Sequence, residues 1–286
     1  MKIALLTCAT WPGIQEKERA IAKEFSPHIQ VDVVVWNDAA VNFRDYQCLI
    51  FRTTWDYFEQ PEQFAAWLEK IAQLGIKTIN PISAIRRNQH KFYLKQLQSL
   101  GIDIIPTVFI AKNSGMDLAT LIPTQWQRVI IKPAVSGGAY LTRLFDRSEI
   151  SSVAAEYTPI AAERDLLIQP FMPEIQQQGE LSLLFFGGEF SHAVLKRPSA
   201  GEFRVQSQFG GNYRAIEVSE ELIATAMQII AAFGGELVYA RVDGIIADGK
   251  FLLMELELIE PDLYFDYDRN AKRRYLEAIE AALATP

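Results

Sequence analysis

The sequence has little of the residues that build disulfide scaffolds, zinc sites or covalent catalytic centres. It contains two cysteines, Cys8 and Cys48, among 286 residues, which is too few for a disulfide framework or a zinc ribbon. Its three histidines, His28, His90 and His192, are scattered along the chain, so we expect no histidine metal site. Neither cysteine has a plausible catalytic partner, and no Gly-x-Ser-x-Gly is present, so we expect no protein nucleophile.

Long apolar runs and an excess of positive charge are also missing. No stretch approaches the roughly 20 apolar residues that a membrane span needs, and the apolar run at the N-terminus is too short for a signal-peptide core. Lysine plus arginine number 28 against 35 aspartates and glutamates, a net charge of −7 that disfavours general nucleic-acid binding. We therefore expect a reduced, soluble, cytoplasmic protein with no membrane or nucleic-acid partner.

Hydrophobic residues make up 49% of the chain and occur in short runs that predict three successive units. In the first unit, residues 1–85, strands alternate with helices, which is typical of a parallel sheet with crossovers. The expected strands are 3–7, 29–36, 48–52 and 76–79, and the expected helices are 15–25 and 60–74. The second unit, residues 86–174, has a glycine-containing loop within a small sheet. Its expected helices are 90–100 and 150–157, and its expected strands are 106–110, 129–133, 139–144 and 166–169.

The third unit, residues 175–286, has strands paired across short glycine turns, which are hairpin signals. Its expected strands are 181–186, 190–197, 237–246 and 251–259, and its expected helices are 220–233 and 270–283.

A lysine lies inside an apolar strand of the second unit, just before a glycine loop. Lys132 is followed by Ser136, Gly137 and Gly138. Burial of an unpaired lysine is costly, and a phosphate would offset that cost. The glycines let backbone N–H groups approach a polyphosphate closely. The motif is not a Walker A loop, because the lysine precedes the glycines. The alternative is an edge-strand lysine beside an ordinary turn.

Three acidic residues are predicted on the two strands of one hairpin: Asp243 on the first, and Glu255 and Glu257 on the second. A two-residue loop would place Asp243 opposite Met254 and separate the acids. A three-residue loop with a bulge would place Asp243 opposite Glu255, and the three carboxylates would converge. Converging carboxylates repel one another and need a cation, and oxygen donors suit Mg²⁺ or Mn²⁺. The alternative is a solvated acidic face.

Two further segments carry polar residues at the ends of strands. Arg197 ends one strand, and Arg204 lies in the glycine-flanked segment that follows. Arginines can bind carboxylates or a transferring phosphoryl group. An exposed loop without a ligand is an equally good interpretation of this segment. Residues 52–57, Arg-Thr-Thr-Trp-Asp-Tyr, follow a strand of the first unit. Ligands bind at the carboxyl ends of strands in open α/β sheets. The alternative there is a capped turn.

Taken in order, these motifs resemble the ATP-grasp superfamily, in the branch of prokaryotic glutathione synthetase. The resemblance covers residues 85–285. Its motifs are Lys91, Lys132 to Gly138, residues 167–175, Gly179-Glu180, Lys196-Arg197-Pro198, Arg204, Arg241-Val242-Asp243 and residues 254–261. Segments 35–38 and 52–57 are similar to a narrower group, which includes a ligase that closes the ring of D-cycloserine from O-ureido-D-serine. The implied fold is α/β: an N-terminal parallel-sheet pre-ATP-grasp domain, a small central α+β lid domain and a C-terminal antiparallel-sheet domain.

The resemblance also implies roles for individual residues. The nucleotide-binding residues are Lys91, Lys132, Ser136, Gly137, Gly138, Gln169, Phe171 and Glu180. The lysines hold the ATP phosphates under the serine-glycine loop, the glutamine and phenylalanine lie at the adenine, and the glutamate binds the ribose. The metal ligands are Asp243, Glu255 and Glu257, of which the third is often Asn in the family. Arg197 and Arg204 lie near the γ-phosphate or the acyl phosphate, and Arg241 contacts the substrate carboxylate.

The implied activity is ATP-dependent joining of a small carboxylate to an amine, through an acyl phosphate, with ATP and Mg²⁺ or Mn²⁺. Intramolecular cyclo-ligation is one form of it. A homodimer is implied by family habit alone. A non-catalytic ATP-binding protein, as in the synapsin-like branch, is the alternative. An α/β dehydrogenase is disfavoured, because the Gly-x-Gly-x-x-Gly fingerprint is missing.

Overall fold

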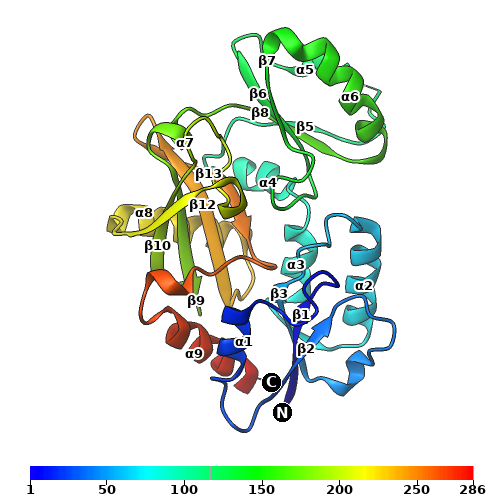
Figure 1. Cartoon of the computed structure of the whole chain (residues 1–286), viewed down its shortest axis with the longest axis vertical. Helices are drawn as coiled ribbons and strands as arrows, with labels where there is room; N and C mark the ends of the chain where they lie inside the picture. The colour runs from blue at the N-terminus through cyan, green and yellow to red at the C-terminus, as the bar shows by residue number, and fades with distance from the viewer. Residues whose placement is uncertain (116, 286) are drawn as a thin grey trace.

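The structure of the protein, a computed structural model, describes residues 1–115 and 117–285 and holds three sheets (Figure 1). Each sheet takes its strands from one stretch of the chain: blue to cyan, then green, then yellow-green to orange in the figure. The first sheet is parallel and the other two are antiparallel, which confirms the predicted fold class. The unit boundaries at residues 85 and 174 stay a prediction. Across the described residues, no helix is long and apolar enough to cross a membrane.

The N-terminal sheet has the order β2-β1-β3-β4. Its strands are β1 (Lys2–Thr7), β2 (Gln30–Val35), β3 (Cys48–Thr53) and β4 (Lys77–Ile79), and its helices are α1 (Glu16–Ala22) and α2 (Pro61–Gln73). Pro61 begins α2, where its missing N–H has no helical partner to lose. The helix buries Phe64, Trp67, Leu68 and Ile71, a helical stripe that packs on strand β3, itself buried along its whole length.

The central sheet has the order β5-β8-β6-β7 and is joined to the first by α3 (Ile82–Asn88) and α4 (Tyr93–Ser99). Its elements are β5 (Val108–Ile110), α5 (Leu118–Leu121), β6 (Arg128–Pro133), β7 (Arg143–Asp146), α6 (Ile150–Glu163) and β8 (Leu166–Pro170). The expected strand at 139–144 is wrong, because its first half is a turn. Ala139 and Leu141 have φ of 63° and 46°, and Tyr140 N–H donates to Gly137 O at 2.9 Å. The sheet ladder therefore begins only at Arg143.

The C-terminal sheet has the order β11-β10-β9-β12-β13. Its elements are α7 (Glu174–Gln177), β9 (Glu180–Phe186), β10 (Glu189–Arg197), β11 (Asn212–Ile216), α8 (Glu220–Phe233), β12 (Tyr239–Ala247), β13 (Lys250–Glu257) and α9 (Ala271–Ala284). One face is apolar and packs on α4 and α8 through residues such as Leu183, Val242 and Leu256. Because successive side chains alternate between faces, the residues between them lie on the other side. That other face carries the charged residues of the next subsection.

The hairpin of β12 and β13 places Asp243 opposite Glu255, as predicted, but by another route. The turn has two residues, Asp248 and Gly249, with φ of 49° and 75°. A bulge then shifts the register, so that Gly244 pairs with Leu253 and no partner is left for Met254. The prediction of a three-residue loop is therefore wrong, and a bulge inside the ladder produces the same pairing.

Candidate functional site

The charged face of the C-terminal sheet collects acidic and basic side chains from four adjacent strands. Residues paired across antiparallel strands point to the same side of a sheet. The pairs are Lys196 with Glu180, Asp243 with Ser182, Asp243 with Glu255, and Arg241 with Glu257. These residues are buried or partly buried, so each charge depends on its neighbours rather than on water.

Asp243 lies at the centre of this face and is ionised. It accepts hydrogen bonds from Ser182 Oγ at 2.5 Å and from Arg241 Nη2 at 2.8 Å, and Lys196 Nζ lies 3.6 Å from its carboxylate. Burial opposes its ionisation, but Arg241 and Lys196 outweigh burial and lower the pKa of Asp243 to about 2. The carboxylate is thus held as an anion in a protein interior.

The other two predicted metal ligands are each paired with a protein cation. Arg241 forms an ion pair with Glu257, and Lys91 Nζ lies 3.0 Å from Glu255 Oε1. Burial raises the pKa of Glu257 well above its usual range, and Asp243 and Glu255 add to the rise against the opposing effect of Arg241. Within residues 1–115 and 117–285, no three His, Cys, Asp or Glu side chains are arranged to hold a metal ion. The three acids share one face, and Arg241 lies between Asp243 and Glu257, paired with both.

Two lysines approach this face from the central unit. Lys91, buried before α4, donates from Nζ to Ser136 O at 2.5 Å. Lys132 lies on β6, and among the described residues it forms no ion pair. Burial lowers the pKa of Lys132, Glu255 opposes that effect, and Lys91 adds to it. The two lysines and Glu255 are therefore close enough for their charges to interact.

The expected phosphate loop is held between the three units. Ser136 is buried and donates from Oγ to Pro133 O at 3.0 Å. A Cβ on Gly137 would lie 2.8 Å from a ring carbon of Phe58, in the N-terminal unit. Gly138 has φ of 56°, and a Cβ there would lie 3.6 Å from the side-chain nitrogen of Gln208.

The expected adenine and ribose ligands lie at the ends of β8 and β9. Gln169 is buried and donates from Nε2 to Thr107 Oγ1 at 2.9 Å. Phe171 N–H donates to Arg128 O at 2.9 Å, and the guanidinium of Arg128 lies 4.2 Å from the Phe171 ring centre. Glu180 forms an ion pair with Lys196, and burial raises the pKa of Glu180 despite that pair.

The two arginines expected near the phosphates do not join the cluster. Arg197 is exposed at the end of β10, where its Nε donates to Gln178 O at 3.3 Å. Arg204 is paired with Glu202 at 2.6 Å and lies 3.6 Å from the centre of the Phe209 ring. Its cation is thus engaged within its own loop.

Sequence reasoning missed two members of the cluster, Lys196 and Glu260. Lys196 belongs to the segment Lys196-Arg197-Pro198 of the sequence analysis, and strand alternation places it on the opposite face from Arg197. Its position across the hairpin from Glu180 was the signal that could have identified it as a member of the cluster. Glu260 follows the end of β13, where no periodic pattern applies. Burial and then Glu255 raise the pKa of Glu260 to about 8.

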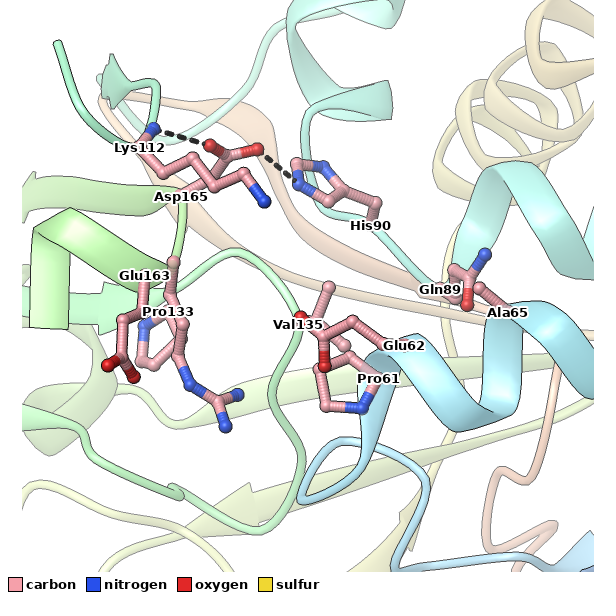
Figure 2. A pocket seen from close by; sticks show the side chains of 11 residues that line it. Pro61, Glu62, Ala65, Gln89, His90, Lys112, Pro133, Val135, Glu163 and Asp165 are labelled. Atoms are coloured by element: carbon pink, nitrogen blue, oxygen red, sulfur yellow. Dashed lines mark hydrogen bonds and ion pairs between the residues drawn. The ribbon is translucent and has the colours of Figure 1, made fainter.

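A cavity of about 220 Å³ lies between the N-terminal and central units, and none of the predicted site residues lines it. Its lining includes His90, Pro133 and Val135, the chain neighbours of the two lysines and the loop. Figure 2 shows Asp165 joining the His90 ring to the backbone nitrogen of Lys112, at 2.8 and 2.6 Å. The charged face is therefore separate from this cavity.

Two parts of the chain match known families. Residues 90–249 match the family described as prokaryotic glutathione synthetase, ATP-grasp domain, and residues 3–80 match the N-terminal domain of D-cycloserine synthetase DcsG. The cycloserine biosynthesis protein DcsG of Streptomyces lavendulae is 26% identical over 269 residues, 89% of each chain. A glutathione synthetase of Ralstonia nicotianae is 26% identical over 234 residues, 79% of this chain and 68% of that one.

Solved structures share the fold. The crystal structure of D-cycloserine synthetase DcsG superposes with a TM-score of 0.88 at 24% identity, over 99% of this chain and 100% of that one. The D-alanine–D-alanine ligase of Bacillus anthracis complexed with ATP superposes with a TM-score of 0.71 at 17% identity, over 100% of this chain and 97% of that one. At these identities the likeness concerns the fold alone.

Proposed function

The chain belongs to the prokaryotic glutathione synthetase family of ATP-grasp proteins, and on that premise we propose that it activates a small amino-acid-like carboxylate as an acyl phosphate. It is an ATP-dependent carboxylate–amine ligase, as its motifs predicted. In the proposed reaction, a carboxylate oxygen attacks the γ-phosphorus of ATP and ADP leaves. A nitrogen nucleophile then attacks the acyl carbon, and phosphate leaves with the bonding electrons.

One observation carries this proposal: among the described residues, Lys132 is a cation of the cluster that forms no ion pair with a carboxylate. Lys91 is paired with Glu255, and Lys196 with Glu180, whereas Lys132 is half-buried and forms no ion pair with any described residue. An unpaired lysine in a protein interior is costly. A phosphate group would supply its counter-charge and would lie between β6 and the acidic face.

We assign the remaining nucleotide contacts on the same basis. Lys91 and Lys132 bind the phosphates, and the loop of Ser136, Gly137 and Gly138 covers them with backbone N–H groups. Gln169 and Phe171 border the adenine. Glu180 binds the ribose, and Arg204, once released from Glu202, is a ligand for the transferred phosphoryl group.

Enzymes of this family use a divalent metal, and we propose Mg²⁺ or Mn²⁺ held by Asp243, Glu255 and Glu257. The donors fit, because carboxylate oxygens are the ligands that these ions prefer, and burial together with Asp243 and Glu255 raises the pKa of Glu257. A bound ion would neutralise charge on the phosphates. It would also replace Arg241 as the counter-charge of Asp243 and Glu257, and would free that guanidinium for the substrate carboxylate.

The test is ADP release with Mg²⁺-ATP. The chain is supplied with pooled amino acids, with dipeptides or with O-ureido-D-serine, each with and without an added amine. Release that depends on one pool is the expected result, and it names the carboxylate class. Release that needs no added amine would indicate the intramolecular reaction. Binding of Mg²⁺-ATP without release from any pool would contradict the proposal and favour a binding role.

Glu255→Gln separates the ligase from a non-catalytic ATP-binding protein. In a ligase the substitution removes a phosphate-side carboxylate, so we expect turnover to fall by at least about 100-fold, the scale of losing one electrostatic stabiliser. Mg²⁺-ATP binding would be partly kept. Glu59→Gln, at an exposed position, is the matched control. A binding protein would show no turnover to lose.

Two finer features belong to the same proposal. An ATP-consuming ligase depends on an ATP supply, so we place the activity in the cytoplasm. The homodimer stays a prediction, and sedimentation of the full chain tests it.

A further inference from the structure

The turn that follows β3, residues 54–58, lies between the acidic face and the phosphate loop. Trp55 Nε1 donates to Glu260 O at 3.1 Å, next to the end of β13. Tyr57 is buried, and burial, Glu260 and then Glu255 raise its pKa well above the usual range. The first half of the turn is therefore bound to the side of the site where the substrate carboxylate is proposed to react.

Phe58, the last residue of this turn, packs against the phosphate loop. A Cβ on Gly137 would lie 2.8 and 2.9 Å from two Phe58 ring carbons, so the ring lies directly over the glycine. The Phe58 ring is 5.2 Å from that of Tyr140, which closes the same loop by donating its N–H to Gly137 O. Arg164 Nη1, after α6, donates to Phe58 O at 3.2 Å.

The loop has fixed contacts on its other sides as well. Lys91 Nζ donates to Ser136 O at 2.5 Å, which ties the loop to a proposed phosphate ligand. A Cβ on Gly138 would lie 3.6 Å from Gln208 Nε2, in the loop that carries Arg204. Of these contacts, Phe58 supplies the one from the N-terminal unit, and it does so with a rigid ring.

We propose that Phe58 is a positioning residue that couples the substrate-side turn, residues 54–58, to the closed position of the phosphate loop, residues 136–138. The inference rests on the proposed function. A displacement of the turn moves the ring, and the ring permits or blocks the close approach of Gly137. Glycine is required there because any side chain meets the ring, and Gly137 is not among the glycines with positive φ. Closure over the nucleotide thus depends on the state of the turn, which limits loss of an acyl phosphate to water.

A double-mutant cycle on the full chain tests this coupling. The variants are Phe58→Ala, Gly137→Ala and the pair, and the readout is the Kd for Mg²⁺-ATP by titration calorimetry. We expect Gly137→Ala to weaken binding by at least about 10-fold, because overpacking against a ring is costly. Phe58→Ala weakens it by about 3-fold or more. The pair binds at least about 5-fold more tightly than the product of the two effects predicts, as contacting residues are not additive.

Controls separate positioning from general packing. Tyr46→Ala removes another aromatic ring packed on the same N-terminal core, whose polar partners are Asp32 and Lys2 rather than residues of the loop, and should leave the Kd within about 2-fold. Phe58→Tyr keeps the ring face and should restore wild-type binding. Melting temperatures without nucleotide report any loss of folding in the variants.

The outcomes are distinct. Multiplicative effects in the cycle, or a Kd unchanged by Phe58→Ala, would overturn the inference and leave the ligase intact. Because the Kd needs no acceptor, a chain that binds Mg²⁺-ATP but ligates nothing overturns the proposed function alone. A chain that fails to bind Mg²⁺-ATP overturns both.

Discussion

Two buried arginines on strands of this chain, Arg52 and Arg241, have different surroundings. Arg52 binds Glu18 through two nitrogens, at 2.9 and 2.7 Å, and lies 5.7 and 5.5 Å from the ring centres of Tyr239 and Tyr275. One guanidinium and one carboxylate are enclosed by aromatic rings, and their charges cancel. Burial opposes the charge of Arg52, but Glu18 outweighs it and raises the pKa further.

Arg241 belongs to a cluster in which carboxylates exceed cations by one. The acids are Glu180, Asp243, Glu255, Glu257 and Glu260, and the cations are Lys91, Lys132, Lys196 and Arg241. The pKa values of Glu180, Glu257 and Glu260 are raised and that of Lys132 is lowered. The charged forms of these groups are therefore not fully compensated by their neighbours. A balanced pair stabilises the fold, whereas an unbalanced cluster favours a charged ligand.

The largest expected effect comes from breaking the balanced pair. Arg52→Met leaves the Glu18 carboxylate buried without a partner, so we expect the free energy of unfolding to fall by about 3–5 kcal/mol. Thermal and denaturant unfolding measure it. The double substitution Arg52→Met with Glu18→Leu should regain most of the loss, because no charge is left uncompensated. A loss below about 1 kcal/mol in the single variant would show that the pair is not a structural element.

The second effect concerns the unbalanced cluster and has the opposite sign for stability. Lys132→Met removes a half-buried cation that forms no ion pair with the described residues, so the nucleotide-free chain should melt at the same or a higher temperature. The Kd for Mg²⁺-ATP should rise by about 30-fold, as expected when one member of a buried charge pair is lost. A variant that binds Mg²⁺-ATP like the wild type would contradict the assignment of Lys132 to a phosphate.

The third effect is a pH dependence from Glu260. Its folded pKa, about 8, exceeds the ordinary value of 4.5, so the folded chain binds more protons between these values. Stability from this group is therefore fully present below pH 4.5 and is lost as the pH rises towards 8. Glu260→Gln removes that loss. The difference in melting temperature, variant minus wild type, should therefore increase by a few degrees between pH 5 and pH 9, since each kcal/mol of stability corresponds to roughly 2–4 °C. The measurement needs EDTA and no nucleotide; a constant difference would refute the raised pKa.

The smallest effect separates two neighbours on β10. Arg197 is exposed, and exposed charges contribute little, so Arg197→Ala should change turnover by less than about 2-fold. Lys196→Met, which leaves Glu180 without its buried cation and Asp243 with Arg241 alone, should reduce turnover far more. Steady-state ADP release compares the two variants. An equal loss of turnover in both would indicate that Arg197 binds the phosphates after all.

Much of the fold followed from local pattern. Alternating strands and helices in residues 1–85 predicted the parallel sheet, and glycine turns predicted the antiparallel one, because strand and helix periods are set by the chain's own sterics. The expected strand at 139–144 failed where left-handed residues, Ala139 and Leu141, make a turn that an apolar pattern does not reveal.

The candidate site divides in the same way. The period of two along β13 placed Glu255 and Glu257 on one face from sequence alone, but whether Asp243 shared that face depended on the turn and on a bulge that the sequence did not reveal. It did not determine that Arg241 lies between two of these acids, since that depends on side-chain packing within the folded sheet.

The family, the sheet types and the residue types of the acidic face could be predicted from the sequence, because each depends on short segments of chain. Three contacts became visible only in the folded chain: Lys196 rather than Arg197 joins the cluster, Glu260 borders it, and Phe58 covers Gly137. Two of these contacts, Lys196 with Glu180 and Phe58 with Gly137, join residues that are 16 and 79 positions apart in the chain. Their partners are set by how separate elements pack, and no local pattern carries that information.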